Sequence, residues 1–235
     1  LYPYWNYASH YIRRGTVPLW WTGIMAGDPA IGEAQYGLLN PLNWGLFLLG
    51  SIPKSMVLFR GLIPLFIAGA GMYTYLRRSP IWRLPAVGAL IGALGFMFSD
   101  PFFTHLGHPQ INEAIAWLPW CLLAVDSVVI GHRSWPLASL SLFMLPASGH
   151  YQTGLFSSVA VILYALWRAL SAPVRAWLPR IGRLLIVGLV AIGLAMPILL
   201  PGFERYPFTE RAHLEIRPWK AYSWPPEMTV DLLAP

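Results

Sequence analysis

The sequence predicts an all-α protein, a polytopic bundle of transmembrane helices, and three observations support this prediction. Of the 235 residues, 56% are hydrophobic and only 11% are charged, whereas soluble domains are nearer a quarter charged. The apolar residues fall into runs of roughly the length that crosses a bilayer, about 20 residues. The basic residues collect in alternate loops between these runs, which is typical of cytoplasmic loops in membrane proteins.

Six apolar runs are expected to cross the membrane. They are 56–76, 84–99, 113–131, 135–148, 154–170 and 183–201. Two earlier segments are expected to lie at the membrane surface. Residues 5–14 suit an interfacial helix, and its aromatic side chains either anchor at headgroup level or form a stacking wall for a sugar. The apolar part of 41–53 is too short to cross, so it predicts a re-entrant or interfacial helix.

The arginines assign an orientation to these spans. They lie between the first two spans, between the third and fourth, and around the fifth and sixth: Arg77, Arg78, Arg83, Arg133, Arg168, Arg175, Arg180 and Arg183. The alternate loops, 100–112 and 149–153, contain no lysine or arginine. We therefore expect the arginine loops in the cytoplasm. The opening loop 15–41, the loops 100–112 and 149–153, and the C-terminal segment then share the outer face.

Charge and motifs exclude several other classes. The net charge of +6 does not indicate nucleic-acid binding, since the basic residues are divided among short loops and form no single basic face. The single cysteine, Cys121, rules out an internal disulfide and is expected to be buried in its apolar run. The sequence has no GxxxxGK[ST], HExxH, GxSxG or DxD motif, which weakens the case for ATP-driven transport and serine hydrolysis.

Composition divides the chain into three parts. Residues 1–40 form an outer-face loop with an interfacial helix, 41–201 form the transmembrane helical domain, and 202–235 begin a mixed-charge outer-face loop or domain. The chain starts without methionine and stops just after the apolar pair Leu232 and Leu233. We therefore expect a fragment of a longer protein, which leaves room for a further span before Leu1.

The scarce acids, imidazoles and amides gather on the predicted outer face. They are Asp28, Glu33 and Gln35 in the opening loop, Asp100, His105, His108, Gln110, Asn112 and Glu113 in the next loop, His150, Tyr151 and Gln152 in the third, and His213 in the C-terminal segment. Ionisable groups at a membrane edge are costly and commonly functional. Converging loops of this kind predict a cleft with general acid–base capacity.

Several of these residues also have a purely structural interpretation. Asp28 lies in a Gly-Asp-Pro turn, where aspartate caps the backbone, so turn formation and substrate contact both stay open. His150 either caps the fifth span or binds substrate. His105 and His108 would need further ligands to hold a metal, so no residue is assigned to a metal, although a divalent metal cofactor stays open.

Two charged residues lie near the ends of spans. Asp126 is expected to form an ion pair close to His132 and Arg133. Arg60, one turn inside its span, either snorkels to the headgroups or holds a lipid phosphate.

The opening loop resembles the first outer loop of the YfhO-like bacterial membrane proteins. The residues that carry this resemblance are Arg14, Gly15, Pro18, Leu19, Trp20, Gly27, Pro29, Gln35, Gly37, Asn40 and Pro41. His105, the run 117–120 and the sequence GHYQ at 149–152 also fit outer-edge positions of that family. The resemblance covers nearly the whole chain.

That family is similar to the GT-C glycosyltransferases, so the resemblance implies a GT-C-like bundle in a bacterial plasma membrane. It implies transfer of a sugar from a polyprenyl-phosphate donor to a cell-envelope glycan or protein on the outer face. Its principal acid would precede the residues matching 1–4, which leaves Asp28 and Glu33 as the catalytic candidates within this chain, either as bases or as ligands of sugar hydroxyls.

The resemblance also implies roles for the other candidates. Trp20, Trp21 and Tyr36 would stack on a sugar, His105, His108 and His150 would hold the departing phosphate, Arg14 and Arg60 would pair with it, and Gln35, Gln110 and Gln152 would complete the substrate-binding set. The alternative is a transporter or lipid-handling membrane protein without covalent chemistry. Transporters place polar residues near the bilayer midplane, whereas the polar residues here collect at one edge.

The orientation can be tested with reporter fusions. We expect alkaline phosphatase to be active when it is fused after residues 30, 106 and 150, and GFP to fluoresce when it is fused after residues 81 and 173. The physical reason is that loops rich in arginine are retained in the cytoplasm. Fusions that place Asp28, His105 and His150 on different sides of the membrane would contradict the predicted topology.

Overall fold

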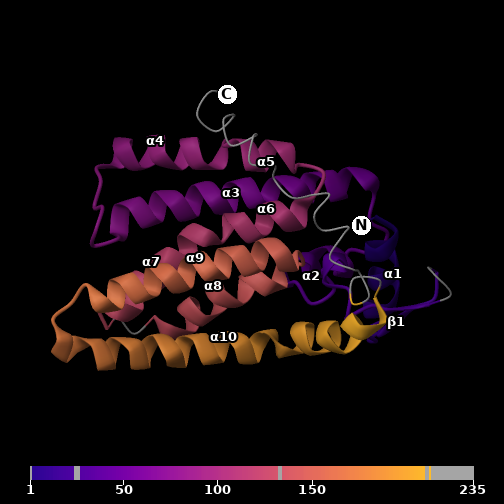
Figure 1. Cartoon of the computed structure of the whole chain (residues 1–235). Coiled ribbons are helices and arrows are strands. Elements are labelled where there is room, and N and C mark those ends of the chain that lie inside the picture. Colours follow the sequence, from indigo (N-terminus) through magenta and orange to yellow (C-terminus); the bar gives the residue numbers. More distant parts are fainter. Residues whose placement is uncertain (1, 24–26, 132–133, 210–211, 213–235) are drawn as a thin grey trace, which may run out of the picture.

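The computed structural model describes residues 2–23, 27–131, 134–209 and 212, and these residues form an almost entirely helical protein (Figure 1). In chain order the elements are α1 (Tyr2–Ile12), β1 (Trp20–Trp21), β2 (Asp28–Pro29), η1 (Ala34–Tyr36), α2 (Pro41–Leu48), α3 (Lys54–Arg78), α4 (Ala86–Met97), α5 (Asp100–Thr104), α6 (Pro109–Ala116), α7 (Leu118–Val129), α8 (Trp135–Ala147), α9 (Tyr151–Leu170), η2 (Val174–Ala176), α10 (Trp177–Arg205) and η3 (Tyr206–Phe208). The predicted all-α class is confirmed.

Within the described residues, five helical segments are long and apolar enough to cross a membrane. They are Lys54–Arg78, Ala86–Thr104, Pro109–Val129, Tyr151–Leu170 and Val174–Phe208. The remaining predicted span forms α8, which has only 13 residues. At a rise of about 1.5 Å per residue, α8 is about 20 Å long, whereas the hydrocarbon core of a bilayer is about 30 Å thick. Five of the six predicted crossings are therefore supported by length, and α8 is a shorter apolar helix.

The helices lie side by side along one axis, so the molecule has two distinct ends (Figure 1). At one end lie α1, α2 and the hairpin of β1 and β2, and we call this the hairpin end. The C-terminal ends of α3 and α9, with Arg77, Arg78 and Arg168, lie at the opposite end, together with the C-terminal end of α7. The described parts of the segments predicted for the outer face share the hairpin end. Which side of a membrane that end faces stays a prediction.

Two helices organise the packing. Helix α3 packs against α4, α6 and α7, whereas α10 packs along α8 and also contacts α7 and α9. Helix α10 continues through Pro197 and Pro201 as far as Arg205. The helix therefore runs across the predicted boundary between 201 and 202, and the division of the chain into three parts stays a prediction. His213 and most of the predicted C-terminal segment lie outside the described residues.

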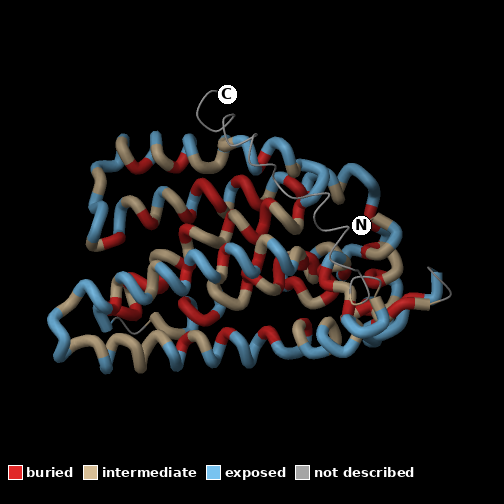
Figure 2. Tube along the Cα trace, in the orientation of Figure 1, coloured by how far each residue is buried: buried red, intermediate tan, exposed pale blue. Residues whose placement is uncertain are grey.

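The outer surface of the bundle is apolar. Buried residues concentrate where helices face one another (Figure 2), yet many large side chains on α4, α9 and α10 point outward and are exposed, among them Ile91, Leu163 and Leu189. Contiguous apolar surface of this extent is rare on soluble monomers. It suits a protein whose surroundings are lipid.

A polar network ties three helices together at the end opposite the hairpin. Asp126 on α7 is only 1% exposed, and its carboxylate accepts hydrogen bonds from Ser79 Oγ at 2.5 Å, Tyr164 Oη at 2.9 Å and Arg168 Nε at 2.5 Å. The expected ion pair of Asp126 is confirmed, with Arg168 as its partner. Arg133 and His132, the neighbours in sequence, lie outside the described residues.

A second buried network joins the surface helix α2 to the bundle near the hairpin end. Arg60 is 2% exposed and forms a salt bridge with Glu113, which is 1% exposed. Arg60 Nε also donates to Asn43 Oδ1 at 2.9 Å, and Asn40 Nδ2 donates to Glu113 Oε1 at 2.8 Å. Asn40 additionally caps α2, since its Oδ1 accepts from the backbone N–H of Leu42 at 3.0 Å.

This network corrects the prediction for Arg60. Its guanidinium does not snorkel to the headgroups, because α3 carries it inward against α2 and α6, where Glu113 neutralises it. The same enclosure separates Arg60 from any phosphate at the protein surface. The pair joins α3 to α6, since leaving either charge unpaired in an apolar interior is costly, and the hydrogen bonds of Asn40 and Asn43 attach α2 to it.

Removing one partner of this pair tests its structural role. Glu113→Ala should lower the free energy of unfolding by about 3–5 kcal/mol, because it leaves the Arg60 charge buried without a carboxylate. Chemical denaturation of the purified protein in detergent measures the loss. The control is Glu204→Ala at an exposed glutamate, expected within about 0.5 kcal/mol of the parent.

The double variant Arg60→Met/Glu113→Met should regain part of the loss, because it buries no unpaired charge. Equal stability of Glu113→Ala and Glu204→Ala would contradict the interpretation.

Candidate functional site

The two catalytic candidates of the opening loop meet at one arginine. Asp28 Oδ1 lies 2.9 Å from Arg205 Nη2, and Glu33 Oε2 forms a salt bridge with Nη1 of the same guanidinium. Arg205 is the last residue of α10, so this contact joins the opening loop to the C-terminal end of the longest helix. We call Asp28, Glu33 and Arg205 the acid–arginine cluster.

Asp28 is held by a further contact on its other side. It belongs to β2, which pairs with β1 in the register Trp21 to Asp28, and the hydroxyl of Tyr36 donates to Asp28 Oδ2 at 3.3 Å. Burial raises the pKa of Tyr36 above its usual value, and the neighbouring Tyr4 and the carboxylates of Asp28 and Glu33 raise it further. Tyr36 therefore stays protonated and remains a donor to Asp28.

Close backbone contacts hold the loop against the bundle. A Cβ atom on Gly32 would lie 3.1 Å from the carbonyl oxygen of Pro201 and 3.6 Å from Arg205 Cβ. Gly149 precedes α9 with a φ of +91°, and its Cα faces the carbonyl group of Ala34. Glycine is favoured at position 149 for two reasons. A residue with a side chain rarely adopts this φ, and its Cβ would also collide with the opening loop.

The aromatic residues of the opening segment form an internally packed cluster. Tyr4 stacks on Tyr36 with ring centroids 3.6 Å apart, and Trp21 lies 4.2 Å from Tyr4 and 4.5 Å from Tyr7. Trp21 is 6% exposed, whereas Trp20 is 52% exposed. Of the three predicted sugar-stacking residues, Trp20 thus presents the most open ring, while Trp21 and Tyr36 mainly support the hairpin.

The histidines do not join the acid–arginine cluster in any described contact. His105 and His108 flank the turn between α5 and α6, and their ring centroids lie 6.5 Å apart. His105 Nδ1 lies 3.0 Å from the carbonyl oxygen of Pro101. His150 caps α9, because its Nδ1 accepts from the backbone N–H of Thr153 at 3.2 Å. The capping interpretation of His150 is confirmed.

The remaining substrate-binding candidates differ in how far they are exposed. Arg14, Gln35 and Gln152 are exposed, whereas Gln110 is half-buried. Arg60 belongs to the buried network with Glu113. Among the described residues, no group of three or more His, Cys, Asp or Glu side chains is arranged to hold a metal ion.

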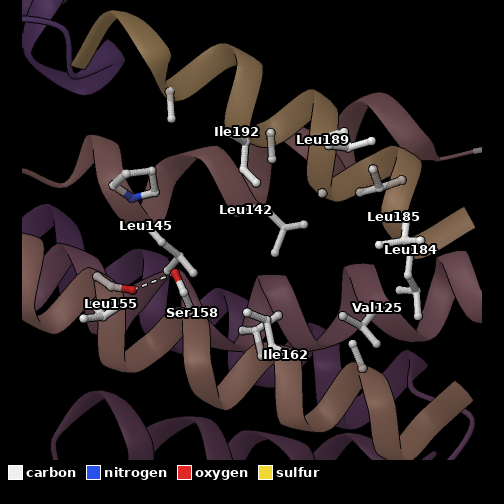
Figure 3. A pocket seen from close by; sticks show the side chains of 18 of the residues that line it. Val125, Leu142, Leu145, Leu155, Ser158, Ile162, Leu184, Leu185, Leu189 and Ile192 are labelled. Carbon is white, nitrogen blue, oxygen red and sulfur yellow. Dashed lines mark hydrogen bonds between the residues drawn. The ribbon is translucent and has the colours of Figure 1, made fainter. Parts of the chain in front are cut away.

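A large apolar groove lies between α7, α8, α9 and α10. Its volume is about 1010 Å³, and Figure 3 shows side chains from all four helices around one space, including Val125, Leu142, Ile162 and Leu185. The described side chains that line it carry no charge. Several of them, such as Ile162 and Leu185, are more than half exposed, so the groove opens sideways from the bundle.

The groove approaches the acid–arginine cluster at the hairpin end. The groove is lined there by Gly202 and Phe203 of α10 and Tyr206 of η3, which are close neighbours of Arg205 in the chain. Tyr151 of α9 also lines it. The hydroxyl of Tyr151 donates to the carbonyl oxygen of Ile198 at 3.3 Å. One end of the apolar groove is therefore lined by chain neighbours of Arg205, the cation that Asp28 and Glu33 share.

Arg205 is the functional candidate that the sequence did not reveal. It lies 172 positions from Glu33 in the chain, inside a segment that was assigned to a mixed-charge loop. The sequence offered one signal for it, which is a basic residue about one turn after Pro201, at the end of a long apolar run. Comparisons with protein-family models, curated proteins and solved structures found no match for the chain.

A glycine substitution tests how the loop is held. Gly149→Ala should lower the free energy of unfolding by about 1–3 kcal/mol, because it combines a disfavoured backbone conformation with overpacking against Ala34. Limited proteolysis within residues 15–40 should accelerate with it. The matched control is Gly107→Ala in another loop of the hairpin end, where an added Cβ meets nothing within 4 Å. Equal effects of both variants would contradict the proposed contact.

Proposed function

We propose that this chain belongs to a membrane glycosyltransferase that transfers a sugar from a polyprenyl-phosphate donor to an acceptor hydroxyl. The observation that carries the proposal is the apolar groove that is lined at its hairpin end by the chain neighbours of Arg205, the partner of Asp28 and Glu33. A lipid-linked sugar needs this combination of an apolar channel for the chain and charged groups for the reacting end. The resemblance of the opening loop to the YfhO-like proteins supports the same reaction.

The proposed reaction is a displacement at the anomeric carbon. The acceptor oxygen forms a bond to this carbon while the bond between the carbon and the donor phosphate oxygen breaks, and polyprenyl phosphate leaves with both electrons of that bond. A carboxylate takes the proton of the acceptor hydroxyl. In this proposal Asp28 or Glu33 takes that proton, and Arg205 stabilises the negative charge that develops on the phosphate.

The outer-edge residues would extend this site toward the sugar and the acceptor. Trp20 offers the exposed aromatic face on which a sugar ring can stack. His105 and His108 lie at the same end of the bundle and would serve the acceptor side or the departing phosphate. In this proposal the hairpin end faces away from the cytoplasm, in a bacterial plasma membrane, and the acceptor is a cell-envelope glycan or protein.

A second candidate function is lipid handling without covalent chemistry, and the groove itself favours it. The groove is apolar and opens along its side, as a site for a lipid chain would in a protein that only carries or moves lipids. In that case Asp28 and Glu33 would serve only to hold Arg205. The two functions differ in one respect, which is the need for a carboxylate that accepts a proton.

A transfer assay separates the two. Membranes carrying the protein should transfer sugar from a radiolabelled polyprenyl-phosphate donor, and Asp28→Asn or Glu33→Gln should slow the transfer by about 10²–10⁴-fold if that residue is the base. The matched control is Glu204→Gln, an exposed acid near the same end of α10, expected to transfer at the parent rate. Transfer at the parent rate by both loop variants would reject the roles given to Asp28 and Glu33, and no transfer by the parent would reject the glycosyltransferase.

A further inference from the structure

Both carboxylates of the acid–arginine cluster are already engaged. Asp28 bonds Arg205 through Oδ1 and Tyr36 through Oδ2, and Glu33 bonds Arg205 through Oε2. Both oxygens of Asp28 and one oxygen of Glu33 are therefore engaged, so an acceptor hydroxyl has to compete with Arg205 for these carboxylates, and geometry comes first for a general base. A ligand that draws Arg205 away would free both acids from this competition.

Arg205 is placed where an anionic ligand of the groove would compete for it. Gly202 and Tyr206, which line the groove, lie on either side of Arg205 in the chain, and the side chain of Arg205 is 25% exposed. Its planar fork of donors matches a phosphate as well as it matches a carboxylate. A phosphate at the end of the groove would therefore meet a guanidinium that can exchange one pair of anionic partners for another.

The length of the groove indicates what kind of chain would carry that phosphate. Its lining on α10 runs from Ile181 to Gly202 and continues to Tyr206, which is about 38 Å at 1.5 Å per residue. This exceeds the whole hydrocarbon thickness of a bilayer, about 30 Å. An acyl chain of a phospholipid reaches only through one leaflet, so the groove suits a much longer single chain.

We propose that Arg205 is an exchangeable latch: a phosphate on a long-chain amphiphile bound in the groove between α9 and α10 takes Arg205 from Asp28 and Glu33 and so releases the opening loop. This inference rests on the proposed function and adds to it a ligand for the donor phosphate and a step that frees the acids. No covalent bond changes in this step. The guanidinium exchanges carboxylate oxygens for phosphate oxygens, and the loop loses its attachment to α10.

The backbone at the end of α10 provides for such a movement. Pro197 and Pro201 have no N–H to donate, so the last turns of α10 lack two of the hydrogen bonds that would stiffen them. Gly32 lies close against the carbonyl of Pro201. A shift of Arg205 therefore moves backbone that the opening loop touches directly, and the contact between Gly32 and Pro201 separates when the latch opens.

Distance measurements between two spin labels test the latch without any transfer reaction. The labels are placed on Thr22→Cys in the loop and Glu204→Cys on α10, both exposed positions, in a Cys121→Ala background because Cys121 is the single cysteine. Pulsed electron resonance in lipid nanodiscs gives the distribution of distances. Adding a polyprenyl phosphate should shift or broaden that distribution toward longer distances.

Three additions separate the sources of the effect. The polyprenol of the same length lacks the phosphate, inorganic phosphate lacks the chain, and phosphatidylglycerol joins a phosphate to short chains, so all three should leave the distribution close to that of the free protein. Arg205→Ala should show the broad distribution before any ligand is added and should bind polyprenyl phosphate at least 10-fold more weakly. Arg205→Lys should bind with intermediate affinity, because it keeps the charge and loses the fork.

Four results would overturn the latch. They are an unchanged distribution at a saturating concentration of polyprenyl phosphate, the same response to polyprenol, an absence of binding by the parent, and a narrow distribution in Arg205→Ala. Failure of the transfer assay with a working latch would reject the glycosyltransferase and leave the latch as part of a lipid-handling protein. Transfer by a protein whose loop does not respond would reject the latch alone.

Discussion

Arg60, Asp126 and Arg205 each lie on a helix that is otherwise mainly apolar, and each is paired with a group from a distant part of the chain. A charge in an apolar interior is strongly unfavourable without a partner, so the pairing constrains which helices can lie next to one another. Glu113 holds Arg60 and thereby joins α6 to α3, and Arg168 holds Asp126 and joins α9 to α7. Apolar contacts between helices are non-directional, whereas these three pairings each require two particular residues to meet.

The third pairing differs from the first two in its surroundings. Arg60 and Asp126 are enclosed, and their partners hold the bundle together. Arg205 is partly exposed, lies at the edge of the bundle, and is shared by Asp28 and Glu33 of a loop that is otherwise held by backbone and aromatic contacts. Pairing of the enclosed kind serves stability, whereas pairing at an open edge can be exchanged for a ligand, and this difference identifies the candidate site.

The sequence predicted local structure well and side-chain partners poorly, and particular residues show why. Asn40 and His150 begin helices, and this follows from short-range capping chemistry that any local reading can find. Arg60 was expected at the membrane surface, and it is buried because Glu113, 53 positions away, folds against it. For Asp28 the sequence left turn formation and substrate contact as alternatives, since its ion-pair partner Arg205 lies far away in the chain.

The sequence by itself determined that the chain is helical and that several of its segments suit a membrane, because hydrophobic runs and helix caps depend on residues a few positions apart. It also determined that arginine-rich segments alternate with segments lacking lysine and arginine. Only the tertiary structure decided which charges meet, where the groove lies, and that Asp28 and Glu33 share Arg205. The reason is physical: pairing and cavity shape arise from the packing of helices that are distant in sequence, and the same apolar helices could pack in several ways until buried charges select one.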